Sequence, residues 1–173
     1  MPYNGLKELT YALTRAWAVH QLTVNEDVSD KGEPVTLFVI PHPTEARYGV
    51  AVEAKETKAG IRCALWFGSV LIAPVIPDDQ ILAAVEEILS DRIVAVVKYK
   101  HRDAYDDRHP SGWQKVFQLT RDHDSDEGAF RALMTRLTAP PTFADRLPGG
   151  PGIGVFEIAR WSSVSVVDRI NKK

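Results

Sequence analysis

Three segments with strand character follow one another between residues 35 and 73, separated only by short connections. They are Val35–Ile40, Tyr48–Lys55 and Ile61–Ala73, and they are rich in β-branched and aromatic residues or alternate in polarity. Parallel neighbours need a crossover of roughly a dozen residues or more, whereas antiparallel neighbours need only a turn. The connection Thr57–Gly60 is too short for a crossover. The sequence therefore predicts an antiparallel β-meander, with Gly68 as a bulge or bend in its third strand.

Helical periodicity occurs before and after this meander. Apolar residues recur every three or four positions over 4–22, from Asp78 or Asp79 to about Leu89, and over 124–137, which predicts three helices, the second of them capped by Asp78 or Asp79. Asp124 and Glu127 have the spacing of a capping box. Two more strands are expected at Ile93–Val97 and Trp113–Thr120, and one or two within 153–167, interrupted near Trp161. The predicted order is α-β-β-β-α-β-β-α followed by one or two strands, an α+β fold.

The remaining segments are expected to be loops. Residues 25–34 are polar, and residues 101–112 are highly charged. Residues 139–152 combine many prolines and glycines, which excludes a regular element and predicts a long connector before the C-terminal strands. We expect a single α+β domain over residues 1–173, because this length is ordinary for one domain.

Composition excludes several classes of protein. Hydrophobic residues make up 45% and charged residues 25%, which is typical of a globular protein. The net charge of −2 argues against a dedicated nucleic-acid binder, which needs a basic surface. The single cysteine, Cys63, lies in an apolar run and is expected to be a buried, inert thiol. The sequence shows neither a leader segment nor an apolar stretch long enough to span a membrane, so we expect a cytoplasmic protein.

The order of elements is similar to the secretion-chaperone-like fold, which type III secretion chaperones share with bacterial YbjN-type domains. The resemblance covers residues 4–137. It is carried by Val35–Ile40, Tyr48–Lys55, Ile61–Ala73 leading through Pro77, Asp78 and Asp79 into a helix, Ile93–Val97, Trp113–Thr120 and Asp126–Leu137. The resemblance implies a non-catalytic, often dimeric module that binds a peptide or protein. It transfers no particular site residue.

One cluster has the residue types of a catalytic site. Glu53 and Lys55 lie two positions apart on a predicted strand, so both side chains share one face. In nucleases with a Glu-x-Lys strand motif, carboxylates hold Mg²⁺ and the lysine stabilises the developing charge. The nearest second carboxylate is Glu45. The alternative interpretation is a solvated sheet face, on which Glu and Lys alternate with Val and Ala.

The charged loops offer a second candidate, a metal site. Histidines and carboxylates are frequent in 101–109 and again in 122–126, and His101, Asp107, His109 and His123 form the candidate ligand set. A divalent metal would be the cofactor in this case. The alternative interpretation is two charged connecting loops without a ligand.

Because neither cluster forms a complete catalytic set, we expect a non-enzymatic, chaperone- or adaptor-like module without a cofactor. It would bind a protein or peptide through its sheet, with a homodimer as a possible form. Large aromatic residues concentrate at binding hot spots, so Trp66, Trp113 and Trp161 are the candidate binding residues. A metal-dependent nuclease or hydrolase is the alternative function.

Overall fold

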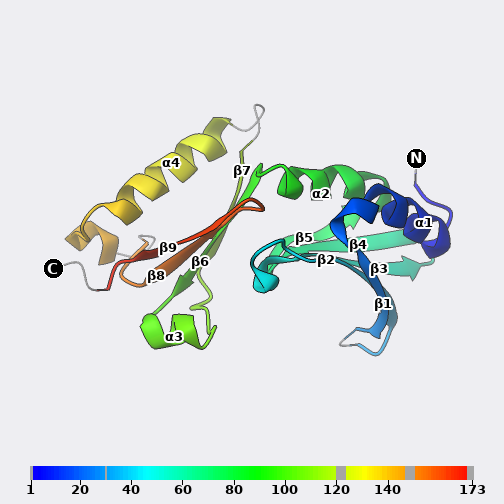
Figure 1. Cartoon of the computed structure of the whole chain (residues 1–173), viewed down its shortest axis with the longest axis horizontal. Helices are drawn as coiled ribbons and strands as arrows, with labels where there is room; N and C mark the ends of the chain where they lie inside the picture. Colours follow the sequence, from blue (N-terminus) through cyan, green and yellow to red (C-terminus); the bar gives the residue numbers. More distant parts are fainter. Residues whose placement is uncertain (1, 30, 120–123, 147–150, 171–173) are drawn as a thin grey trace. The chain divides into compact units, whose positions relative to one another are not determined.

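The computed structural model describes residues 2–29, 31–119, 124–146 and 151–170. Its internal contacts divide the chain into two compact units, Met1–Leu89 and Ser90–Lys173. Each unit is an antiparallel sheet with helices packed on it (Figure 1). The predicted α+β class with a β-meander is confirmed. The expectation of a single domain over residues 1–173 stays a prediction.

The first unit is a five-stranded meander with helices at its beginning and end. Its elements are α1 (Leu6–Ala16), η1 (Ala18–His20), β1 (Thr23–Val28), β2 (Pro34–Ile40), η2 (Ala46–Tyr48), β3 (Val50–Thr57), β4 (Gly60–Phe67), β5 (Val70–Pro77), η3 (Asp78–Gln80) and α2 (Ile81–Leu89). The strands lie side by side in chain order, and each pairs antiparallel with the next.

Both helices of this unit cover the same face of its sheet (Figure 1). The apolar stripes that they bury are Leu9, Leu13 and Trp17 at α1, and Ile81, Val85 and Ile88 in α2. The strands contribute cross-strand rows such as Phe38–Val52–Leu65 and Ile40–Val50–Phe67. All members of these rows are 1% exposed or less. Helices on one face leave the other face of the sheet open.

Three predictions for this unit were wrong, and two of them concern turns. The expected single strand Ile61–Ala73 is two strands, β4 and β5, joined by a turn at Gly68 and Ser69. Gly68 has φ +59°, as the first central position of a type II′ hairpin turn requires. The expected loop 25–34 includes most of β1, which pairs with β2 through the turn at Gly32. Helix α1 ends at Ala16 rather than near Leu22.

The second unit is a four-stranded antiparallel sheet with α4 on one face. Its elements are β6 (Ile93–Tyr99), α3 (Arg102–Asp106), β7 (Gln114–Gln118), α4 (Asp124–Thr138), η4 (Phe143–Arg146), β8 (Val155–Ala159) and β9 (Val164–Asp168). The strand order is β7-β6-β8-β9. Val94, Val96, Phe117, Phe130, Leu133, Leu137, Phe156 and Ile158 form the core between this sheet and α4. The predicted interruption between the last two strands is confirmed.

Local capping differs from the sequence expectation. The loop expected at 101–112 contains α3, and His101 caps it by accepting a hydrogen bond from the Ala104 backbone N–H through Nδ1, at 3.1 Å. Asp78 does not cap α2; its carboxylate accepts a hydrogen bond from the Tyr3 N–H at 2.6 Å. The side chain of Asp124, one member of the expected capping box, lies outside the described residues.

A buried arginine holds the two ends of the Pro/Gly-rich loop. Arg169, directly after β9, is 1% exposed and donates to the backbone carbonyls of Ala139 and Gly152 at 3.4 and 3.2 Å. Its guanidinium also contacts the Asp145 carboxylate at 3.2 Å. Arg136 binds the other carboxylate oxygen at 3.0 Å. A buried charge is tolerated only with partners, so this network fixes where the loop leaves α4 and re-enters the sheet.

Cys63 is expected to be unreactive in the folded protein. Its side chain is 2% exposed, and burial, reinforced by the charge of Asp78, raises the pKa of its thiol from the ordinary 9.0 to about 12. Because only the thiolate attacks, native protein should react with a disulfide reagent at pH 8 roughly a thousandfold more slowly than urea-unfolded protein. Equal rates in the two states would contradict this placement.

Candidate functional site

The candidate site lies on the open face, which we define as the face of the first unit's sheet opposite α1 and α2. Two cross-strand rows form its floor, Leu37–Glu53–Ala64 and Lys55–Arg62, and Val35 of β2 also lines it. A hollow of about 580 Å³ covers both rows. We call this hollow the groove.

The β1–β2 hairpin and strand β5 form the walls of the groove. On the hairpin side, Asp27 to Ser29, Lys31 and Glu33 line it. On the opposite side, Pro74 and Val75 line it, at the point where the β4–β5 register is irregular. Val75 is 59% exposed, so this wall presents apolar surface to solvent. The groove thus crosses the strands from the hairpin to β5.

The charges of the groove are mixed and only partly paired. Lys55 donates to the Glu33 carboxylate, which ties the hairpin to β3, and this contact lowers the pKa of Glu33. Arg62 lies directly opposite Lys55 on the neighbouring strand. Among the described residues, neither Arg62 nor Glu53 forms an ion pair or side-chain hydrogen bond. One acid and one base are therefore available to a bound molecule.

An apolar row adjoins the groove on the same face. Val39, Ala51, Trp66 and Leu71 lie opposite one another on β2 to β5, one step along the strands from the groove floor. All four side chains are half-buried. Such a row next to a charged hollow resembles the composition of a protein interface, which combines an apolar centre with a polar rim.

The structure brings together two of the three residues of the nuclease hypothesis. Glu53 and Lys55 share the groove, as the strand spacing predicts. Glu45 lies in the loop before η2, where its backbone N–H donates to His42 at 2.9 Å and its carboxylate contacts Arg47 at 3.6 Å; it does not line the groove. Lys55 is engaged by Glu33. The nuclease hypothesis stays a prediction.

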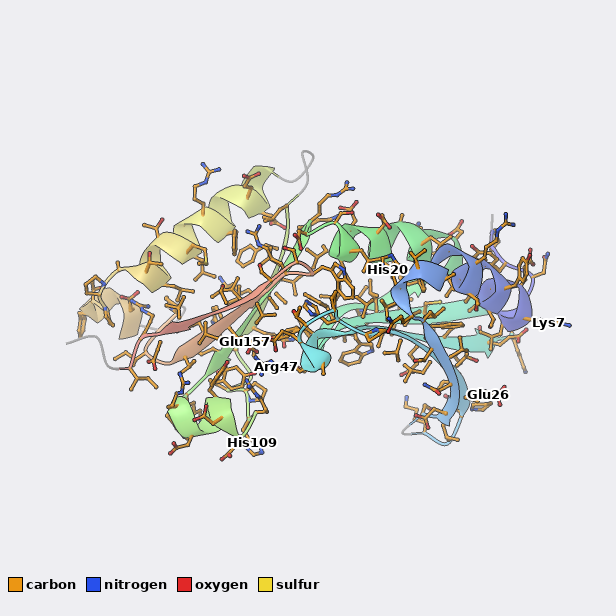
Figure 2. The ribbon with its side chains drawn as sticks, viewed as in Figure 1. Lys7, His20, Glu26, Arg47, His109 and Glu157 are labelled. Atoms are coloured by element: carbon orange, nitrogen blue, oxygen red, sulfur yellow. The ribbon has the colours of Figure 1, made fainter. Side chains whose placement is uncertain are left out.

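The metal candidates lie in the second unit. His101, Asp107 and His109 line one hollow of about 390 Å³ together with Lys100 and Ser111, and His109 follows α3 in the chain (Figure 2). His123 lies outside the described residues. In the part of the chain that the structure describes, no three His, Cys, Asp or Glu side chains are arranged to hold a metal ion. A divalent metal cofactor stays a prediction.

The three tryptophans have different surroundings, and none is fully exposed. Trp66 belongs to the apolar row of the open face. Trp113 packs against the second unit's core, with its ring 5.7 Å from that of Phe156 in an edge-to-face contact. Trp161 is half-buried in the turn between β8 and β9. Trp66 thus combines partial exposure with a place beside the groove.

Sequence reasoning missed the residues of the hairpin wall, Asp27, Lys31 and Glu33, because the polar stretch 25–34 reads as a loop. The missed signal is the pair of strand-forming residues Val24 and Val28 before Gly32, with a β-branched run after it. Arg62 was missed because its opposition to Lys55 depends on the strand register, which the sequence alone does not fix.

Fold and site define an α+β protein with an open sheet face that carries a charged groove and an apolar row. Comparison with protein-family models, with curated proteins and with solved structures found no match. None of the described helices has the length and apolar character needed to cross a bilayer.

Proposed function

We propose that this protein is a non-enzymatic binding module, chaperone- or adaptor-like, that holds an extended segment of a partner protein on the open face of its first unit. The observation that carries the proposal is the groove beside the apolar row. The row, centred on Trp66, supplies area whose removal from water favours binding, and the groove supplies polar contacts that fix the orientation of the bound segment.

The charge of the groove favours a peptide over a uniformly charged polymer. Its lining includes the acids Asp27, Glu33 and Glu53 and the bases Lys31, Lys55 and Arg62. These formal charges cancel, so the groove offers no net attraction for the phosphates of nucleic acid. A peptide with side chains of both signs can satisfy Glu53 and Arg62 together.

Selection from a library of random twelve-residue peptides, followed by measurement of affinity for the full chain, tests the proposal. Trp66→Ala and Glu53→Lys should each weaken a selected peptide by about tenfold, the effect of losing a moderate hot spot. Val19→Ala is the control, because Val19 is 84% exposed in η1 and lies outside the open face. Peptides that bind all three variants equally would contradict the proposal, and so would a selection without binders.

Two further properties belong to the proposal. Dimerisation is expected from the resemblance to secretion chaperones, and a mass measurement in solution tests it. A cytoplasmic location agrees with one reduced, buried cysteine. Cleavage of DNA or RNA with Mg²⁺ or Mn²⁺ that disappears in Glu53→Ala would instead support the nuclease alternative.

A further inference from the structure

Strand β1 is an unusually open edge. It is the first strand of its sheet, and among the described residues no strand pairs with its outer side. All six of its residues are exposed, whereas every other strand of this sheet has buried residues. Figure 1 shows it at the border of the sheet. The Val28 N–H donates to the Asp27 carboxylate at 2.7 Å, and the other backbone N–H and C=O groups on the outer side can therefore pair with an added strand.

The side chains of β1 give this edge a chemical pattern. Every second residue of the strand, namely Val24, Glu26 and Val28, has its side chain on one face of the sheet. This is the face of Phe38 and Thr36 on β2. Val24 is 40% exposed and Val28 63% exposed, so two apolar side chains flank one carboxylate. Figure 2 shows Glu26 on this strand. Among the described residues, Glu26 forms no ion pair or side-chain hydrogen bond.

We infer that a further stretch of the same partner protein pairs with β1 as a sixth strand, and that this stretch carries a basic residue between two apolar residues at alternate positions. In an antiparallel register the apolar pair covers Val24 and Val28 while the lysine or arginine lies opposite Glu26. Directly opposed charges of unlike sign and opposed β-branched residues both stabilise strand pairing. The other side chains of the added strand would extend the open face beside Asp27, which lines the groove. This inference rests on the peptide-binding function proposed above.

A second copy of the chain fits this edge poorly. Two β1 strands can pair antiparallel in the register that sets Val24 opposite Val28 of the other copy. That same register sets Glu26 directly opposite its own copy, which destabilises the pair. Shifting by one residue removes the clash of charges but places Val24 opposite Asp27, so the valines lose their apolar partners. The edge thus selects a basic strand over itself.

Two capped peptides test the inference, Thr-Val-Thr-Lys-Thr-Val-Thr and its counterpart with Glu in place of Lys. Their binding to the full chain is measured by NMR titration, and β1 pairing is measured by amide hydrogen exchange. The lysine peptide should slow exchange in β1 and bind about fivefold more tightly than the glutamate peptide. Glu26→Lys should reverse this preference. Glu56→Lys, an equal charge change at an exposed residue of β3, should leave it unchanged.

Several results would overturn the inference. One is a preference for the lysine peptide that survives Glu26→Lys, and another is the absence of slowed exchange in β1. If library peptides bind in a Trp66-dependent way but the lysine peptide does not slow exchange in β1, the edge pairing is wrong while the proposed function stands. If the library yields no binder, the proposed function itself fails.

Discussion

Replacing Gly68 by alanine should lower the free energy of unfolding by about 3 kcal/mol, since a left-handed residue and a steric clash combine at one position. Gly68 has φ +59°, and a Cβ there would lie 2.8 Å from the Arg47 carbonyl oxygen and 2.8 Å from a ring carbon of Tyr48. The neighbouring backbone cannot yield easily, because the Gly68 N–H donates to the Gly49 carbonyl at 2.8 Å. Urea unfolding measures the loss.

Gly32→Ala is the matched control for Gly68→Ala. Gly32 also has a positive φ, +75°, but a Cβ there would meet no atom within 4 Å. Gly32→Ala should therefore lower the free energy of unfolding only by the cost of a left-handed alanine, about 1 kcal/mol. Equal losses in the two variants would show that the clash at Gly68 is relieved, and that the β4–β5 turn is looser than its contacts indicate.

The same glycine explains where the sequence prediction failed. Ile61–Ala73 is apolar nearly throughout. Two adjacent strands that each bury one face can have the same apolar composition as one long strand that buries both faces. What distinguishes them is the two-residue turn at Gly68 and Ser69, which has no proline or asparagine to strengthen its signal. The meander itself was predictable, because its connections are too short for anything else.

The site was predictable only where it depends on spacing along a single strand. Glu53 and Lys55 share a face because side chains alternate with a period of two, and this is visible in the sequence. The opposition of Lys55 and Arg62 depends on register, and the contact with Glu33 depends on a hairpin that reads as a loop. Burial and the turns together set the register, so these contacts follow only from the folded chain.

Asp145→Asn should cause a second large loss of stability, a fall of roughly 10 °C in the thermal midpoint, because it leaves Arg169 buried without its anion. Arg169 is 1% exposed, and the amide that replaces the carboxylate carries no charge to balance its guanidinium. Scanning calorimetry at pH 7 measures the change. Arg131→Gln, which breaks only the exposed pair with Glu127 in α4, is the control and should stay within about 2 °C.

A double variant and a pH series separate the charge from the shape of this network. Asp145→Asn combined with Arg169→Met removes both charges and should recover part of the loss, whereas a purely steric defect would persist.

The Thr142 backbone N–H, with Arg136 and Arg169, holds the pKa of the Asp145 carboxyl well below its usual range, although burial opposes this. A carboxyl with a lowered pKa contributes stability fully above its unfolded value of about 3.9, and the contribution is lost as pH falls through the lower folded value. The wild type should therefore lose stability more steeply below pH ~4 than Asp145→Asn does, and parallel pH profiles would mean that the Asp145 carboxylate does not stabilise the fold.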